Sequence, residues 1–158
     1  MYKRQGKAFV AVVSEGKGSV DLGTTAVISS DNKLVRDIST GCAEIILSSR
    51  ELSPTHYVDG IVAFLSAKWG GNVYYHWMFD VVIRIDLLCR SGWTSKIDKF
   101  VFSKCDKKFH QETLEALKIP QEKIIESRFI PHIKAKKLLV PSFTIKQGGI
   151  RSPKWGCE

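Results

Sequence analysis

Hydrophobic and polar residues follow different patterns in the two parts of this chain. The first part contains short β-branched segments at residues 8–13, 26–29 and 34–38, separated by Gly-, Ser- and Asp-containing turns at residues 14–18 and 31–33. Short β-branched segments with such turns are typical of a small antiparallel β meander. We therefore expect a β-rich segment over residues 6–57.

Beyond residue 58, continuous apolar runs of strand length alternate with helical patterns. The expected strands are residues 61–65, 100–102, 124–125 and 135–140, and the expected helices are residues 72–90 and 107–118. Asp106 is placed to cap the second helix, and Pro120 follows its end. This order favours an α/β fold with a parallel sheet and right-handed crossovers. Ligands bind such sheets at the carboxyl ends of the strands, where the Gly70–Gly71–Asn72 loop is expected.

The helix expected over residues 72–90 carries the candidate chemistry. Thirteen of its nineteen residues are apolar or aromatic, which predicts a buried helix with Asn72 as its N-terminal cap. His76, Asp80 and Arg84 recur every four residues and would form one polar row. Burial of ionisable groups costs free energy unless they are paired or face a wet cleft. The row is either a structural network or a functional site, and spacing alone favours the network.

The positive charge of the chain, +8 with a pI of about 9.4, raises the question of an anionic partner. The basic residues are scattered, no run reaches five, and aromatic residues are not interleaved with them. We therefore expect no nucleic-acid partner and read most of this charge as solvated surface. A small basic α/β module that binds nucleic acid or acidic polymer without catalysis is the alternative reading.

Cysteine usage and hydropathy indicate the compartment. The four cysteines lie far apart with no Cys-x-x-Cys pair, so the spacing of zinc ligands is absent and a reducing compartment is favoured. The only early apolar run, residues 8–13, is too short for a signal core or a membrane span. We expect a cytoplasmic protein, with peripheral association at the inner face of the membrane as an alternative. A His-Asp hydrolase ranks lowest, because no Gly-x-Ser-x-Gly motif is present.

Both ends of the chain differ from the rest. Residues 1–5 match what a transposon-end sequencing adapter encodes, so we interpret them as an assembly artefact and leave them out of the fold. Residues 146–158, with Gly148, Gly149 and Pro153, are expected to be a linker towards a missing C-terminal lobe.

The run from Gly71 to Asp80, followed by Arg84, resembles the signature of the bacterial family 61 glycosyltransferases, often described as capsular polysaccharide biosynthesis proteins. The resemblance covers most of residues 61–155. Further matching segments are residues 109–114, 119–120, 123–125 and 138–142. Two departures are Ile83, where the family usually has proline, and Val73, which is inserted beside Asn72.

The resemblance implies a GT-B enzyme with two Rossmann-like lobes, of which residues 58–145 would be the N-terminal, acceptor-side lobe. The implied activity is inverting transfer of a sugar from a nucleotide-sugar donor to a glycan hydroxyl in capsule or surface polysaccharide synthesis. The donor site would lie in the missing lobe, so we expect no cofactor in this fragment and no turnover by it alone. No Asp-x-Asp motif is present in this sequence, so it leaves the metal dependence of the full protein open.

The resemblance also implies roles for particular residues. His76 and Asp80 are the candidate catalytic pair, one acting as general base and the other orienting it or balancing its charge. Asn72, Tyr75 and Arg84 are candidates for substrate binding, and Arg84 could pair with Asp80 or meet an anionic acceptor or diphosphate. Two further expectations concern neighbours: at least two of Tyr74, Tyr75 and Trp77 in the core, and His110 on the surface.

Overall fold

The computed structural model describes residues 7–21, 24–41, 43–48 and 54–143. The expectations for residues 1–5 and for the linker at 146–158 lie outside the described residues. Within them, no helix combines the length and the apolar character needed to cross a membrane.

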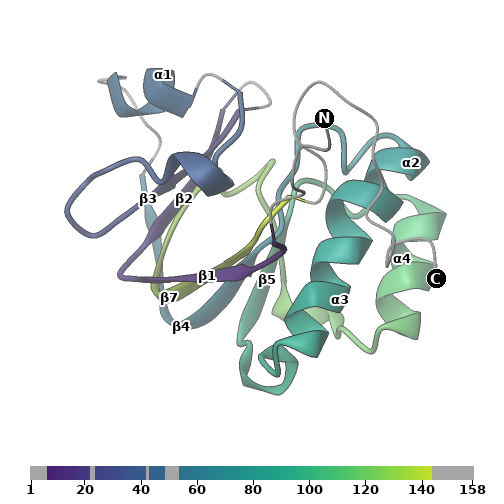
Figure 1. Cartoon of the computed structure of the whole chain (residues 1–158). Coiled ribbons are helices and arrows are strands. Elements are labelled where there is room, and N and C mark those ends of the chain that lie inside the picture. The colour runs from purple at the N-terminus through teal and green to yellow at the C-terminus, as the bar shows by residue number, and fades with distance from the viewer. Residues whose placement is uncertain (1–6, 22–23, 42, 49–53, 144–158) are drawn as a thin grey trace, which may run out of the picture.

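A mixed sheet of seven strands organises the fold (Figure 1). Its order is β3-β2-β7-β4-β5-β6, and β1 also pairs with β7. The strands are β1 (Val10–Ser14), β2 (Lys17–Asp21), β3 (Thr24–Ile28), β4 (His56–Phe64), β5 (Lys99–Phe102), β6 (Ile124–Glu126) and β7 (His132–Pro141). Strands β7, β4, β5 and β6 are parallel, which confirms the α/β prediction for this part, whereas β1, β2 and β3 pair antiparallel.

The N-terminal strands extend the same sheet instead of forming a separate meander. Along β7, the pairing runs without a register shift from Val10↔Pro141 in β1 to Ser19↔His132 in β2. Glu15 between them has a positive φ of 50°, yet its N–H still donates to the Lys136 carbonyl at 3.0 Å. The turn predicted at residues 14–18 is therefore a kink within one continuous edge, because a left-handed residue bends the strand without ending its pairing.

Two other N-terminal features differ from the prediction. The strand predicted over residues 34–38 is largely a 3-10 turn, η1 (Arg36–Ile38), with only an isolated bridge between Leu34 and Ile28. A short helix, α1 (Ala43–Ser48), follows and buries Ala43 and Ile46 against β3.

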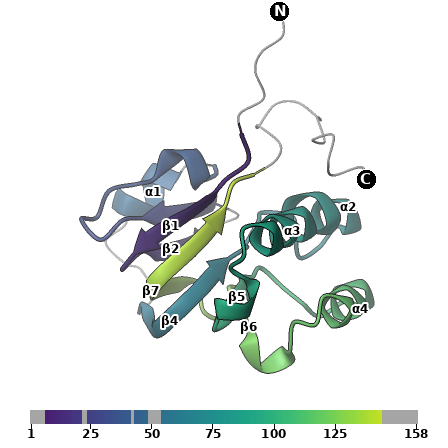
Figure 2. The same cartoon turned by 60° about the horizontal axis from the view of Figure 1, so that its bottom comes forward.

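The remaining helices pack on one face of the sheet (Figure 2). They are α2 (Tyr74–His76), η2 (Trp77–Val82), α3 (Ile83–Arg90) and α4 (Lys108–Ala116), with the 3-10 turns η3 (Thr94–Lys96) and η4 (Gln121–Lys123). Alternate strand residues point to opposite faces. Ala63 and Phe100 accordingly join the core under the helices, whereas Val62 and Val101 join a second core with Val27 and Ile38 from the N-terminal region.

The predicted caps are one residue off. Val73, not Asn72, precedes the first helical residue, and no side chain caps that end. Lys107, not Asp106, occupies the cap position of α4, while Asp106 pairs with Lys104 at 2.9 Å. Asp106 therefore lies one residue before the cap position, and its carboxylate takes part in ion pairs instead.

Candidate functional site

The centre of the candidate site is an ion pair between His76 and Asp80. His76 Nδ1 lies 2.6 Å from Asp80 Oδ2, with side-chain exposed fractions of 34% and 21%. The pair is therefore partly buried but open to solvent on one side. Because Nδ1 faces the carboxylate, His76 Nε2 is left as the nitrogen that can exchange a proton with a bound molecule.

The helix that carries this pair is interrupted by a π-helical segment. Between α2 and α3, residues Trp77–Val82 of η2 form wider turns, and the Ile83 N–H donates to the Met78 carbonyl five residues earlier. Single π turns within α-helices occur frequently at functional sites. The wider turn changes the direction of the side chains that follow it. As a result, the predicted row of three polar residues is divided after Asp80.

Arg84, the third member of that row, points into the protein and is 1% exposed. Its Nε donates to the Pro141 carbonyl at 3.0 Å and its Nη2 to the Phe64 carbonyl at 3.1 Å. Longer contacts run from Nη1 to the Leu65 carbonyl at 3.3 Å and to the Asp80 carbonyl at 3.5 Å.

The position of Arg84 does not suit the substrate contact that was predicted for it. Its guanidinium is occupied by main-chain carbonyls and lies 4.1 Å from the centre of the Phe143 ring. Burial lowers its pKa to about 9, against an opposing effect of the Asp80 charge, so it remains a cation at neutral pH. The structure makes Arg84 a clamp between the helix and the carboxyl ends of β4 and β7.

These contacts place the His76–Asp80 pair at the carboxyl edge of the parallel strands, where ligands bind in open α/β sheets. The loop from β4 to α2 packs there against the loop that follows β5. A Cβ atom on Gly71 would lie 2.6 Å from Lys104 Cβ, so this approach requires glycine. Behind it, Ser66 Oγ lies 2.9 Å from Ser103 Oγ and 2.8 Å from Ser127 Oγ, which ties the ends of β4, β5 and β6 together.

The ends of β5 and β6 also carry a charged network that the sequence did not predict. Asp106 contacts Lys104 at 2.9 Å and Arg128 at 3.3 Å, and Arg128 Nε lies 2.7 Å from Glu126. Cys105 is enclosed beside it, and burial together with the Glu126 charge raises the pKa of this thiol to about 12. A thiol with so high a pKa is not a nucleophile at neutral pH.

The aromatic residues around the pair divide between core and surface. Trp77 is buried and its Nε1 donates to Thr113 Oγ1 at 3.2 Å, whereas Tyr74 and Tyr75 are 59% and 42% exposed. The expectation that at least two of these three residues lie in the core is wrong. Only Trp77, the first residue of η2, is buried, whereas the two tyrosines of α2 are exposed. Tyr75 stays beside His76, with ring centres 5.5 Å apart. Asn72 is exposed in the preceding loop.

His110 was expected on the surface and is instead buried at the start of α4. Its Nδ1 accepts a hydrogen bond from the Lys107 N–H at 3.2 Å. Its ring centre lies 4.3 Å from that of Trp77, with the two ring planes inclined at 58°. Its Nε2 has no hydrogen bond of good geometry. Burial lowers the pKa of this imidazole, against smaller opposing effects of Asp106 and the nearby Gly70 carbonyl. His110 therefore supports the helix start from the interior.

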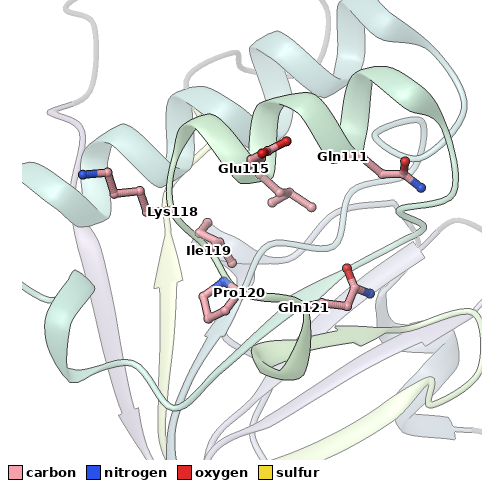
Figure 3. A pocket seen from close by; sticks show the side chains of 7 residues that line it. Gln111, Glu115, Lys118, Ile119, Pro120 and Gln121 are labelled. Carbon is pink, nitrogen blue, oxygen red and sulfur yellow. The ribbon is translucent and has the colours of Figure 1, made fainter.

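A depression in the described surface lies away from this pair (Figure 3). Its volume is about 390 Å³, and it lies where α4 ends and the chain turns towards β6. Gln111, Glu115 and Lys118 are among its lining residues, and neither His76 nor Asp80 is. Among the described residues, no group of three His, Cys, Asp or Glu side chains is placed to hold a metal ion.

Comparison with known proteins finds no matching family model, no matching curated protein and no matching solved structure. The functional argument therefore rests on the motif residues and on their geometry.

Proposed function

We propose that the chain is the acceptor-side lobe of an inverting glycosyltransferase of the GT-B type, which moves a sugar from a nucleotide-sugar donor to a glycan hydroxyl. The observation that carries the proposal is the partly exposed His76–Asp80 pair at the carboxyl edge of a parallel sheet. The resemblance of residues 71–84 to family 61 glycosyltransferases supports the same reading. The cell process is capsule or surface polysaccharide synthesis in the cytoplasm, with the donor held by a second lobe.

In this mechanism His76 acts as the general base. Asp80 accepts the hydrogen bond of the Nδ1–H, fixes the tautomer and stabilises the imidazolium that forms. Nε2 of His76 takes the proton of the acceptor hydroxyl while the oxygen of that hydroxyl attacks the anomeric carbon of the donor sugar. The bond from that carbon to the diphosphate oxygen breaks, and the nucleoside diphosphate leaves with the electron pair.

Arg84 is a positioning residue in this proposal and does not contact the substrate. It joins the last residues of β4 and β7 to the helix and contacts the main-chain carbonyl of Asp80. The clamp keeps the π-helical segment at the edge of the sheet. It therefore holds the carboxylate in the place where it can orient His76.

The test is sugar transfer by Asp80→Asn in the full-length protein that contains this chain. An amide in place of the carboxylate favours the wrong imidazole tautomer, so we expect transfer to fall by roughly 10²- to 10⁴-fold with the fold retained. Asp86→Asn is the matched control, since Asp86 lies in α3, which continues the same helix, and its carboxylate is exposed and pairs with exposed Arg90 at 2.7 Å. Transfer by Asp80→Asn within a few-fold of the wild type would remove the pair from the reaction.

A further inference from the structure

Among the described residues, strand β1 pairs on one side only. On that side it pairs with β7 along its whole length (Figure 2). The carbonyl of Phe9, just before β1, accepts a hydrogen bond from the Ser142 N–H at 2.8 Å and so faces β7. In an antiparallel ladder, alternate residues direct their main-chain groups to the same neighbour. Val10, Val12 and Ser14 therefore direct their N–H and C=O groups to the other side, where no described strand pairs with them.

The two outer strands of the sheet, β3 and β6, are better protected than β1. On the outer side of β3, the Thr25 carbonyl accepts a hydrogen bond from the Thr40 N–H at 2.8 Å. The Val27 carbonyl is engaged in the same way by the Val35 N–H. Strand β6 is only three residues long. Proteins protect exposed edges with charged residues, proline, bulges or short strands, because an open edge recruits another strand. Strand β1, with the sequence Val-Ala-Val-Val-Ser, has five residues and none of these protections.

The side chains of β1 give this edge an apolar character. Val10 packs against the core under the helices, and Val12 points to the same face of the sheet, where it is 46% exposed. Ala11 and Val13 pack against the second core, on the opposite face. An exposed, β-branched and uncharged edge is a template for the addition of a further strand through main-chain hydrogen bonds. The occupant that suits this edge is therefore an extended, uncharged strand.

Strand β1 is complementary to a second copy of itself. Two antiparallel β1 strands related by a two-fold axis at Val12 pair Val12 with its own counterpart, and Val10 with Ser14 in both directions. This register joins every outward N–H and C=O group of both strands. A register centred on Ala11 leaves Ser14 without a strand partner. One centred on Val13 leaves Val10 without one. No like charges meet in the symmetric register, because β1 contains no charged residue.

We propose that two copies of this chain associate through β1 in this antiparallel register, so that their seven-stranded sheets form one continuous sheet. A second copy supplies what the edge lacks, an uncharged extended strand with the same free donors and acceptors. The two Val12 side chains lie next to each other at the two-fold axis and cover part of each other's exposed surface. The interface contains none of His76, Asp80 and Arg84, so the dimer and the proposed catalytic function can fail independently.

The first test is the oligomeric state of the 158-residue chain, measured by analytical ultracentrifugation. One pair of five-residue strands is a small interface, so we expect a weak dimer, with half of the chains paired at roughly 100 μM. Each copy carries a net charge of +8, so added salt should strengthen the association by screening the repulsion between copies. A chain that stays monomeric at about 1 mM would overturn the proposal.

Amide hydrogen exchange tests which edge forms the interface. In the dimer, the N–H groups of Val10, Val12 and Ser14 should exchange at least about ten-fold more slowly than in the dilute monomer. The Val13 N–H, which faces β7, should be protected at both concentrations. Protection of the three outward amides in the monomer would assign this edge to a segment of the same chain and overturn the proposal.

Substitutions at Val12 test the register. Val12→Pro removes the outward N–H from each copy but no donor towards β7, so it should weaken dimerisation at least about ten-fold. Val12→Lys places two ammonium groups together at the axis and should weaken it at least about five-fold. Ile45→Lys is the matched control, since Ile45 is 61% exposed in α1, outside the interface, and should dimerise normally. Far-UV circular dichroism checks that each variant keeps the fold. Undiminished dimerisation of Val12→Lys, or an equal loss in Ile45→Lys, would contradict the assignment of β1 as the interface.

Discussion

Replacement of Arg84 by methionine should destabilise the protein more than any surface change. The guanidinium makes two hydrogen bonds of good length, to the carbonyls of Pro141 and Phe64, and two longer ones. Each good charge-assisted bond contributes about 1.5–3 kcal/mol, and methionine fills much of the volume but cannot donate. Burial of a neutral side chain in place of a cation offsets part of this loss. We therefore expect the free energy of unfolding to fall by about 3–5 kcal/mol.

Urea denaturation followed by far-UV circular dichroism measures this change. Arg90→Met is the control, because Arg90 is exposed on the same helix and its pair with Asp86 should contribute at most about 1 kcal/mol. Arg84→Lys keeps the charge but not the planar set of donors, so its loss of unfolding free energy should lie between those of Arg84→Met and Arg90→Met. If the free energy of unfolding of Arg84→Met lies within about 1 kcal/mol of the wild-type value, the contacts of Arg84 with the ends of β4 and β7 do not stabilise this edge of the sheet.

Two further predictions concern stability. His110 and His132 are buried, and burial lowers the pKa of both below 6.5, so the unfolded chain binds the protons more tightly. The free energy of unfolding should be constant above about pH 7. Below pH 6.5 it should fall by up to about 1.4 kcal/mol per pH unit for each histidine. Urea titrations between pH 7.5 and 5 measure this change, and a flat profile would contradict the prediction. Lys118 follows the end of α4 and has a positive φ of 55°. Glycine adopts this conformation without strain, so Lys118→Gly should raise the free energy of unfolding by about 0.5–1 kcal/mol in the same assay. Lys108→Gly, at the start of the same helix, is the control and should lower it. A loss on Lys118→Gly would show that its backbone is not strained.

The parallel part of the sheet could be predicted because its strands are buried on both faces. Continuous apolar runs such as Val62–Leu65 and Leu138–Val140 contribute to both cores, so the pattern gave their positions closely. The kink at Glu15 could not be predicted in this way. Glycine and serine nearby are also typical of a turn, and only the unbroken pairing with β7 shows that the strand continues.

The candidate site was predicted in part. The four-residue spacing of His76 and Asp80 placed them on one side of a helix, and their side chains do meet at 2.6 Å. The same spacing gave the wrong direction for the Arg84 side chain. A π turn leaves no clear pattern in the sequence, and it rotates the side chains that follow it about the helix axis. Apolar composition also failed to distinguish Trp77 from the exposed Tyr74, because helical periodicity does not say where the edge of the sheet lies.

Chemical rescue of His76→Ala tests the central claim most directly. The side chain of His76 is 34% exposed, so its removal opens a space that added imidazole can reach from solvent. In the full-length protein, we expect sugar transfer by His76→Ala to fall at least 100-fold and to recover in part, in proportion to imidazole concentration. The control is His56→Ala, which removes an exposed histidine outside the site and should transfer sugar normally without imidazole. Transfer by His76→Ala at the wild-type rate, or a loss that imidazole does not restore, would contradict the assignment of this histidine as the base.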